Sequence, residues 1–216
     1  MLLVLVGFLF AFSSGRNQSR KIAELEVKFL GDNNLFITHE SVNKLLIQNG
    51  EPVTNVHKEI LDLNGLENTL KSNAMIKTAE VYLAVNGKVR ADVIQRKPIA
   101  RVSTNASYYI DDEGKYMPLS TNYTAHVPIV TGSVEKNNLA NIYTIANKIY
   151  NDEFLKTHII EIHQNQNRTL SLKTRVYDFE IELGDLNDLN KKINNLKAFY
   201  QQHVLVLHFL LFFVPF

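Results

Sequence analysis

Apolar and polar residues alternate on both sides of Asn86-Gly87, and this pattern predicts a β-hairpin. The alternating apolar positions are Val81, Leu83 and Val85 before the turn and Val89, Ala91 and Val93 after it. A two-residue loop would pair Leu83 with Arg90 and place a charge on the apolar face. A three-residue loop over residues 85–87 pairs Leu83 with Val89 and Val81 with Ala91. We therefore predict this loop, with those four apolar side chains on the core face and Gly87 in a left-handed bulge position.

The segments before the hairpin predict one strand and two helices. Apolar residues alternate over 25–29, Thr38 is placed to cap a first helix, and Asp62 or Asn64 can cap a second helix over 63–72. Pro98 cannot donate to a ladder, so the second hairpin strand should end by Lys97. The predicted order is strand, helix, helix, strand, strand, which fits a small α+β domain.

The second half of the chain predicts a β-rich domain of mainly antiparallel sheet with flanking helices. Its expected elements are two strands around a turn at 111–114, an amphipathic helix over 138–155, a meander over 157–163, 169–177 and 179–183, and a last helix after Gly184-Asp185. The apolar side of that last helix carries Leu186, Leu189, Ile193, Leu196 and Phe199 or Tyr200.

Several short motifs occur in a defined order over about residues 22 to 200. They are Val27-x-Phe29-x-Gly31, Thr38-x-x-Ser41-Val42, Leu66-x-x-x-Leu70-x-x-Asn73-x-x-Ile76-x-x-Ala79-x-Val81, Arg96-Lys97-Pro98-Ile99-Ala100, Tyr109-Ile110-Asp111-Asp112-Glu113-Gly114 and Val127-Pro128-Ile129-Val130-Thr131-Gly132. The first four resemble a POTRA domain with a βααββ order. The whole set resembles the FtsQ/DivIB family of bacterial cell-division proteins, especially its Bacteroidetes-like members.

This resemblance implies a non-enzymatic scaffold of the division machinery, a single-pass protein of the inner membrane with its main part in the periplasm. It implies a POTRA domain over 22–102, a distal β domain over 103–202, and partners of the FtsB and FtsL type that add a strand to an exposed sheet edge. Phe199 and Tyr200, at the end of the last helix, are the nearest positions that match the family's partner-binding region. Packing of the helix against its sheet explains the same two residues equally well.

Both ends of the chain are apolar. Residues 1–12 carry no charge, yet a membrane span needs about 20 apolar residues. Arg16, Arg20 and Lys21 follow this run and by the positive-inside rule favour a cytoplasmic downstream side, the reverse of what the family implies. We expect residues 1–15 to be a membrane anchor whose start is truncated; a cleaved signal segment is the alternative. We expect residues 203–216 to be an atypical apolar tail from a truncated or frameshifted reading frame, with a second membrane segment as the alternative.

Composition argues against several classes of function. The 216-residue chain has a net charge of +1 and no cysteine, so it lacks a broad nucleic-acid-binding charge and any thiolate chemistry. The acids at 111–113 are consecutive, unlike calcium ligands, and predict a turn. His158 and His163 should face opposite sides of one strand, so they predict no metal site. We expect no catalytic, cofactor or metal residue and no small-molecule substrate.

The main alternative is a POTRA-bearing periplasmic chaperone, or a module of secretion or outer-membrane assembly. Such a module would bind client strands by the same edge augmentation. Those systems carry several POTRA repeats or a following transmembrane barrel, and neither pattern is present in this sequence. A hydrolase would need a nucleophile clustered with a base, and the sequence shows no such cluster.

Overall fold

The computed structural model describes two compact units. It covers residues 5–8, 22, 24–31, 34–48, 51–57, 60–176 and 179–213, with the backbone alone at 48, 51, 55 and 203–213. Unit 1 contains Met1–Lys97 and Met117–Thr124, and unit 2 contains Pro98–Tyr116 and Ala125–Phe216. The expected membrane anchor over 1–15 lies largely outside the described residues.

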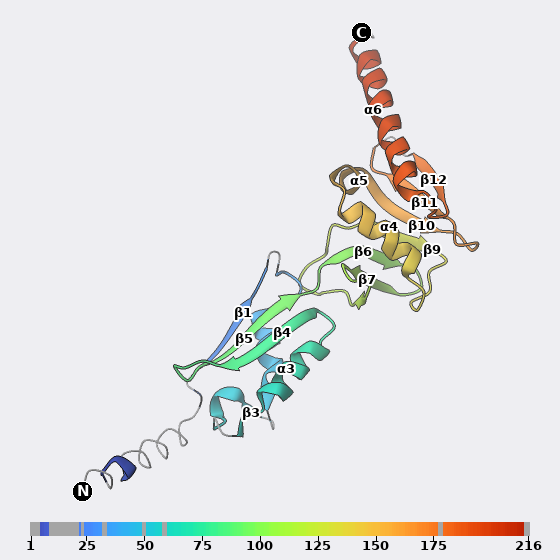
Figure 1. Ribbon diagram of the computed structural model, residues 1–216. Coiled ribbons are helices and arrows are strands. Elements are labelled where there is room, and N and C mark those ends of the chain that lie inside the picture. Colours follow the sequence, from blue (N-terminus) through green and yellow to red (C-terminus); the bar gives the residue numbers. More distant parts are fainter. Residues whose placement is uncertain are drawn as a thin grey trace. The chain divides into compact units, whose positions relative to one another are not determined.

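Unit 1 is a three-stranded sheet with two helices (Figure 1). Its elements are β1 (Leu25–Phe29), α2 (His39–Leu45), α3 (Leu63–Ser72), β4 (Ile76–Leu83) and β5 (Val89–Gln95). The sheet order is β1-β5-β4, with β1 parallel and β4 antiparallel to the central strand. The predicted βααββ order is confirmed. A small pair of strands, β2 (Ile47–Gln48) and β3 (Glu51–Pro52), and a short 3-10 helix (Val53–Asn55) lie between the helices.

The hairpin has the predicted register. Val81 pairs with Ala91 and Leu83 with Val89. The Gly87 N–H donates to the Ala84 carbonyl at 2.9 Å, and Gly87 has a φ of 84°, which only glycine adopts without strain. Val81, Val89 and Ala91 are buried, but the core position predicted for Leu83 is wrong, because its side chain is 37% exposed. Leu83 is the last residue of β4, at the hairpin end of the strand.

The helix starts and the strand end in unit 1 also follow the sequence. The Thr38 hydroxyl accepts from the Ser41 N–H, and an Asp62 carboxylate oxygen accepts from the Gly65 N–H at 2.9 Å. Each side chain satisfies an N–H that the first helical turn leaves without a partner. Strand β5 ends at Gln95, before Pro98, as predicted.

A buried glutamine holds the loop before α2 against the sheet. The Gln95 side chain is 4% exposed. Its oxygen accepts from the Phe36 N–H at 3.0 Å and the Ile37 N–H at 3.3 Å, and its amide donates to the Ile37 carbonyl at 3.0 Å. The Ser120 hydroxyl, from the second segment of unit 1, donates to the Phe36 carbonyl at 2.6 Å. Side chains thus pair the polar backbone groups of a loop that lacks secondary structure.

Unit 2 is built on a seven-stranded sheet in the order β12-β11-β10-β9-β6-β7-β8. Its strands are β6 (Pro98–Ser103), β7 (Ser107–Asp111), β8 (Tyr116–Met117), β9 (Ile129–Gly132), β10 (Ile159–Gln164), β11 (Leu170–Thr174) and β12 (Glu180–Gly184). The β10-β11-β12 meander and the β6-β7 pair are antiparallel, as predicted. Strand β9 runs parallel to both of its neighbours, a pairing that the sequence did not indicate.

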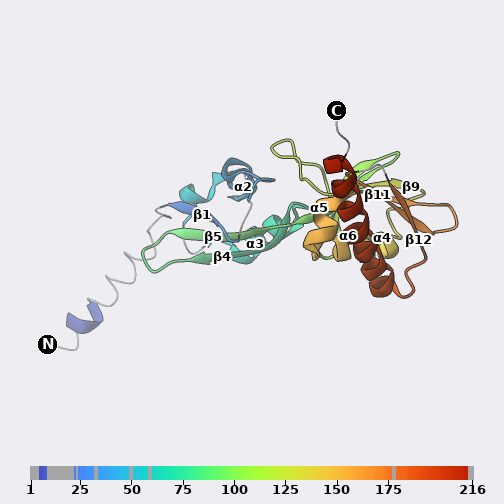
Figure 2. The ribbon, with the colours of Figure 1, turned by 90° about the horizontal axis from the view of Figure 1, so that it is seen from above.

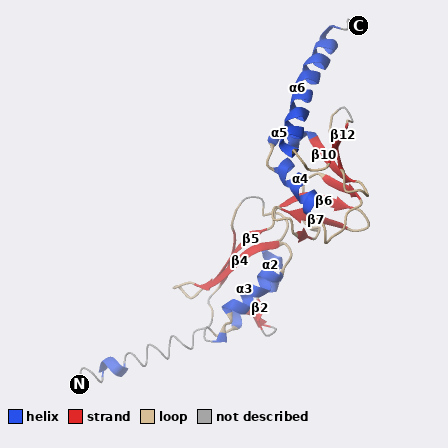
Figure 3. Ribbon diagram, turned by 45° about the vertical axis from the view of Figure 1, so that its right-hand side comes forward, coloured by secondary structure: helices blue, strands red, loops and turns tan. Residues whose placement is uncertain are grey.

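Helices α4 (Ala140–Tyr150), α5 (Glu153–His158) and α6 (Leu189–Phe213) lie on one side of this sheet (Figures 2 and 3). The core between helices and sheet includes Ile142, Ile149, Ile162, Leu172 and Ile193, each at most 1% exposed. The single helix predicted over 138–155 is wrong, because the chain breaks at Asn151-Asp152 and Asp152 caps α5. The strand predicted from residue 157 begins instead at Ile159.

The acidic segment at 111–114 forms the predicted turn. A carboxylate oxygen of Asp111 accepts from the N–H groups of Glu113 at 3.0 Å and Lys115 at 2.7 Å, and Asp111 is fully buried. Its carboxylate therefore organises the loop between β7 and β8.

In the part of the chain that the structure describes, no helix is both long and apolar enough to cross a bilayer.

We predict that Gln95→Leu lowers the free energy of unfolding by about 2 kcal/mol or more, because it leaves two buried N–H donors and one carbonyl without partners. Urea denaturation followed by circular dichroism measures this loss. The exposed Gln166 gives a matched control, since Gln166→Leu should change stability by less than about 0.5 kcal/mol. Equal effects of the two substitutions would contradict a role for Gln95 in holding the loop.

Candidate docking site at the edge of the large sheet

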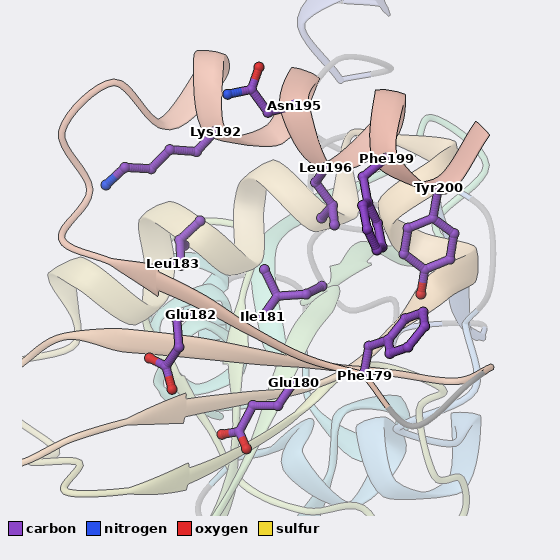
Figure 4. Close-up of a pocket in the computed structure, with 10 residues that line it drawn as sticks. All are labelled: Phe179, Glu180, Ile181, Glu182, Leu183, Lys192, Asn195, Leu196, Phe199 and Tyr200. Carbon is purple, nitrogen blue, oxygen red and sulfur yellow. The ribbon is translucent and has the colours of Figure 1, made fainter. Parts of the chain in front are cut away.

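An apolar groove lies between the edge strand β12 and helix α6 (Figure 4). Its volume is about 480 Å³. The lining residues come from β12 with the residue before it, and from the first half of α6; they are Phe179, Glu180, Ile181, Glu182, Leu183, Lys192, Asn195, Leu196, Phe199 and Tyr200. The lining includes five consecutive residues, Phe179 to Leu183, so the groove runs along β12.

Strand β12 ends the seven-stranded sheet, and no strand among the described residues pairs with its outer side. Ile181 and Leu183 point towards α6, whereas Glu180 and Glu182 point to the other face of the sheet (Figure 4). The strand therefore offers unpaired backbone groups next to an apolar surface. These are the two features that a partner strand needs for backbone hydrogen bonds and for side-chain packing.

The structure brings Phe199 and Tyr200, the two residues expected from the sequence, to this groove. The Phe199 side chain is 42% exposed, and its ring centroid lies 6.0 Å from that of Phe179. Tyr200 is 3% exposed and packs edge-on against Phe154 and His158. Tyr200 thus serves the packing of the helix, while Phe199 leaves apolar surface open. Their role in partner binding stays a proposal.

The Tyr200 hydroxyl is buried without a hydrogen-bond partner among the described residues. A buried hydroxyl without a partner lowers stability, because it has lost its hydration and gained nothing in return. The same ring fills space between α6 and α5, so the aromatic body contributes to stability and the hydroxyl does not.

Two charged contacts fix α6 beside β12. The Lys197 ammonium lies 2.5 Å from Asp152, which also accepts from the Leu155 N–H at 3.2 Å. Lys192 binds the carboxylate of Asp185 at 2.8 Å. Burial raises the pKa of Asp152, but the hydrogen bonds from Lys197 and the backbone of α5 outweigh it and leave the pKa below its ordinary value. The hydrogen bond from Lys192 likewise lowers the pKa of Asp185.

The edge of the smaller sheet differs from that of β12. At β4, the Val81 N–H donates to a carboxylate oxygen of Glu67 at 3.3 Å, and the other oxygen of Glu67 lies 2.5 Å from Lys71. The hydrogen bond from Lys71, followed by that from Val81, lowers the pKa of Glu67. A side chain of α3 therefore occupies part of this edge, as charged residues often do on strands that stay free of partners.

The two histidines that the sequence singled out, His158 and His163, have different hydrogen-bond partners. His158 ends α5 instead of lying on a strand as predicted, and its Nδ1 is 2.7 Å from the Phe154 carbonyl oxygen. His163 lies on β10, where its Nδ1 is 2.8 Å from the Thr131 hydroxyl, which donates to Glu161 at 2.7 Å. Among the described residues, no three potential metal ligands come together.

Sequence reasoning missed most of the groove. It placed residues of the last helix at the site and predicted a strand over 179–183, but it did not place that strand at the sheet edge beside the helix. The alternation of Ile181 and Leu183 with Glu180 and Glu182 was the available signal. That pattern marks a half-buried strand without showing whether the strand is central or at an edge.

The fold defines a two-part protein in which a βααββ domain of the POTRA-like class precedes a β-rich domain whose edge strand β12 has no partner on its outer side among the described residues. Comparison with known families agrees with this class: residues 24–94 match the POTRA-like domain, and residues 97–208 match the family described as FtsQ/DivIB, C-terminal related. No curated protein matched the chain. The chain belongs to the FtsQ/DivIB family. The family is membrane-associated and generally non-enzymatic, and membership suggests a role in cell division that involves other division proteins.

We predict that the ion pair of Asp152 makes stability depend on pH. Because its pKa is lowered in the folded protein, its contribution is present at neutral pH and is lost as the pH falls below about 4, through the lowered pKa. Asp152→Asn retains a capping side chain but cannot titrate. Urea denaturation at pH 7 and pH 3 should show a smaller loss for this variant than for the wild type. An equal loss of stability in the variant and the wild type would contradict the pH-dependent contribution of Asp152.

We also predict that Tyr200→Phe leaves the free energy of unfolding unchanged or raises it by up to about 1 kcal/mol, since it removes an unpaired buried hydroxyl. Tyr109→Phe is the matched control. The buried Tyr109 oxygen accepts from the Ala125 N–H at 3.0 Å, so its loss should lower stability by about 1 kcal/mol. Thermal denaturation compares the two, and a clear loss with Tyr200→Phe would show that its hydroxyl has a partner.

Proposed function

We propose that this protein is a non-enzymatic scaffold of the bacterial division machinery that links other division proteins through docking surfaces. The partners proposed are of the FtsB and FtsL type, and they bind as an added strand at β12. The observation that supports this proposal is the apolar groove beside the unpaired edge of β12. Family membership supports the division context, and the edge geometry supports the mode of binding.

The groove and the edge contribute to binding in different ways. Backbone groups on the outer side of β12 supply hydrogen bonds to any extended chain, whatever its sequence. Phe199, with its exposed ring, and the partly buried Ile181 can receive apolar side chains from every second residue of that chain. Backbone hydrogen bonds at the edge therefore contribute affinity, and side-chain packing in the groove selects the register of the added strand.

The proposed placement in the cell follows the family. We propose a single-pass inner-membrane protein anchored through residues 1–15, with the POTRA domain and the distal β domain in the periplasm. General membrane association of the family supports this placement. The docking edge then lies in the distal domain, next to the last helix.

The alternative of a periplasmic chaperone or assembly module predicts a different use of the same edge. Such a module accepts many unfolded client strands and needs little side-chain selectivity. The match of the second half of the chain to an FtsQ/DivIB region favours the division scaffold.

We predict that Phe199→Ala weakens binding of the division partner by at least about 10-fold, as expected for an exposed aromatic side chain that becomes buried in an interface. Isothermal titration calorimetry with the periplasmic part of the FtsB-type partner from the same organism measures the affinity. The free energy of unfolding should change little, because Phe199 is 42% exposed.

Tyr116 provides the control. It lies on β8 at the opposite edge of the same sheet and is 39% exposed. Tyr116→Ala should leave the affinity within about twofold of wild type, a change of less than 0.5 kcal/mol. Equal losses for Tyr116→Ala and Phe199→Ala, or no loss for either, would argue against docking at β12.

A further inference from the structure

A row of alternating charges crosses the β10-β11-β12 meander and stops at the open edge. Glu161 on β10 pairs with Lys173 on β11, and Lys173 pairs with Glu180 on β12. Directly paired residues of neighbouring strands project from the same face of a sheet. The row therefore reads acid, base, acid, and its last acid lies beside the position that an added strand would fill.

The neighbouring row ends in the same way. His163 on β10 pairs with Ser171 on β11, and Ser171 pairs with Glu182 on β12. The Ser171 hydroxyl donates to a carboxylate oxygen of Glu180 at 3.0 Å, so both rows converge on two exposed glutamates. Glu180 and Glu182 lie two residues apart and point to the same face of the edge strand (Figure 4).

We propose that the strand that docks on β12 carries lysine or arginine at two positions that are two residues apart, facing Glu180 and Glu182. The residues before, between and after these basic side chains are apolar and face the groove beside α6. This inference rests on the proposed docking at β12 and specifies the chemistry of the partner. The occupant is therefore a basic-apolar alternating segment of a protein partner.

The charges on this face of the sheet favour a basic strand over an acidic one. An acidic residue on the added strand would stand directly beside Glu180 or Glu182, and like charges in directly opposite positions destabilise a strand pair. A basic residue would continue the alternation that Glu161, Lys173 and Glu180 already form. On the groove side, Ile181 and Leu183 are apolar, so a charge beside them would lose its hydration.

The test uses three capped heptapeptides that differ at two positions. Each has three leucines at alternate positions and a serine at both ends. The two residues between the leucines are lysine in the first peptide, glutamate in the second and threonine in the third. The chain has no tryptophan, so binding is followed by two-dimensional ¹H–¹⁵N NMR of the labelled protein. The amide signals of β12 report both the site and the dissociation constant.

The expected result is that the lysine peptide shifts the β12 signals and binds about tenfold more tightly than the glutamate peptide, with the threonine peptide between them. In the double variant Glu180→Lys and Glu182→Lys, the order of the lysine and glutamate peptides should reverse. The double variant Glu40→Lys and Glu135→Lys carries the same change in net charge at exposed residues that neither belong to β12 nor line the groove, and it should keep the wild-type order.

The outcomes separate this inference from the proposed function. If all three peptides shift the β12 signals with equal affinity, docking at the edge stands and the charge preference is overturned. If the control double variant reverses the order as well, overall charge explains the preference and the inference is again overturned. If no peptide shifts the β12 signals at millimolar concentration, the docking edge itself is contradicted together with the proposed function.

Discussion

Backbone groups at the edge of a sheet have no partner within the sheet, and the described sheet edges of this protein differ in how far their backbone groups are covered. An unpaired edge strand invites another strand, whether or not that strand is the right one. In unit 1, a carboxylate of α3 accepts from the β4 edge at Val81. In unit 2, strand β8 has only two residues, Tyr116 and Met117, so it offers little backbone to a partner. Strand β12 has five residues and an apolar groove beside it.

The groove exists because α6 is held at a defined distance from β12. Ile193 and Leu196 bury the helix against the sheet, while the contact between Lys197 and Asp152 links it to the start of α5. Asp152 is also the residue that breaks the expected long helix, since its side chain caps α5. One aspartate thus interrupts a helix, begins the next and binds the helix that forms the wall of the groove. The break between α4 and α5 and the position of α6 beside the groove therefore both depend on Asp152.

The sequence predicted most elements of unit 1, because local signals determine them. The alternation of apolar and polar residues around Asn86-Gly87 predicted the register of the hairpin. The capping residues Thr38 and Asp62 predicted where the two helices start. Three features could not be predicted. Leu83 lies on the core face by the alternation of its strand, but the exposure of a residue at a strand end depends on which other segments cover that end. The parallel pairing of β9 depends on contacts between distant segments. The groove depends on β12 being at an edge, which the alternation of its residues does not reveal.

The candidate site was half predicted for the same reason. Phe199 and Tyr200 were expected from the family resemblance, but their different burial depends on rotation about the helix axis. One residue step turns a helical side chain by about 100°, because a helix has about 3.6 residues per turn. Tyr200 consequently points into the aromatic cluster with Phe154 and His158, whereas Phe199 remains partly exposed beside Phe179. Adjacent residues on one helix therefore differ in burial, so a substitution of Tyr200 should affect stability, whereas a substitution of Phe199 should affect the docking proposed at β12.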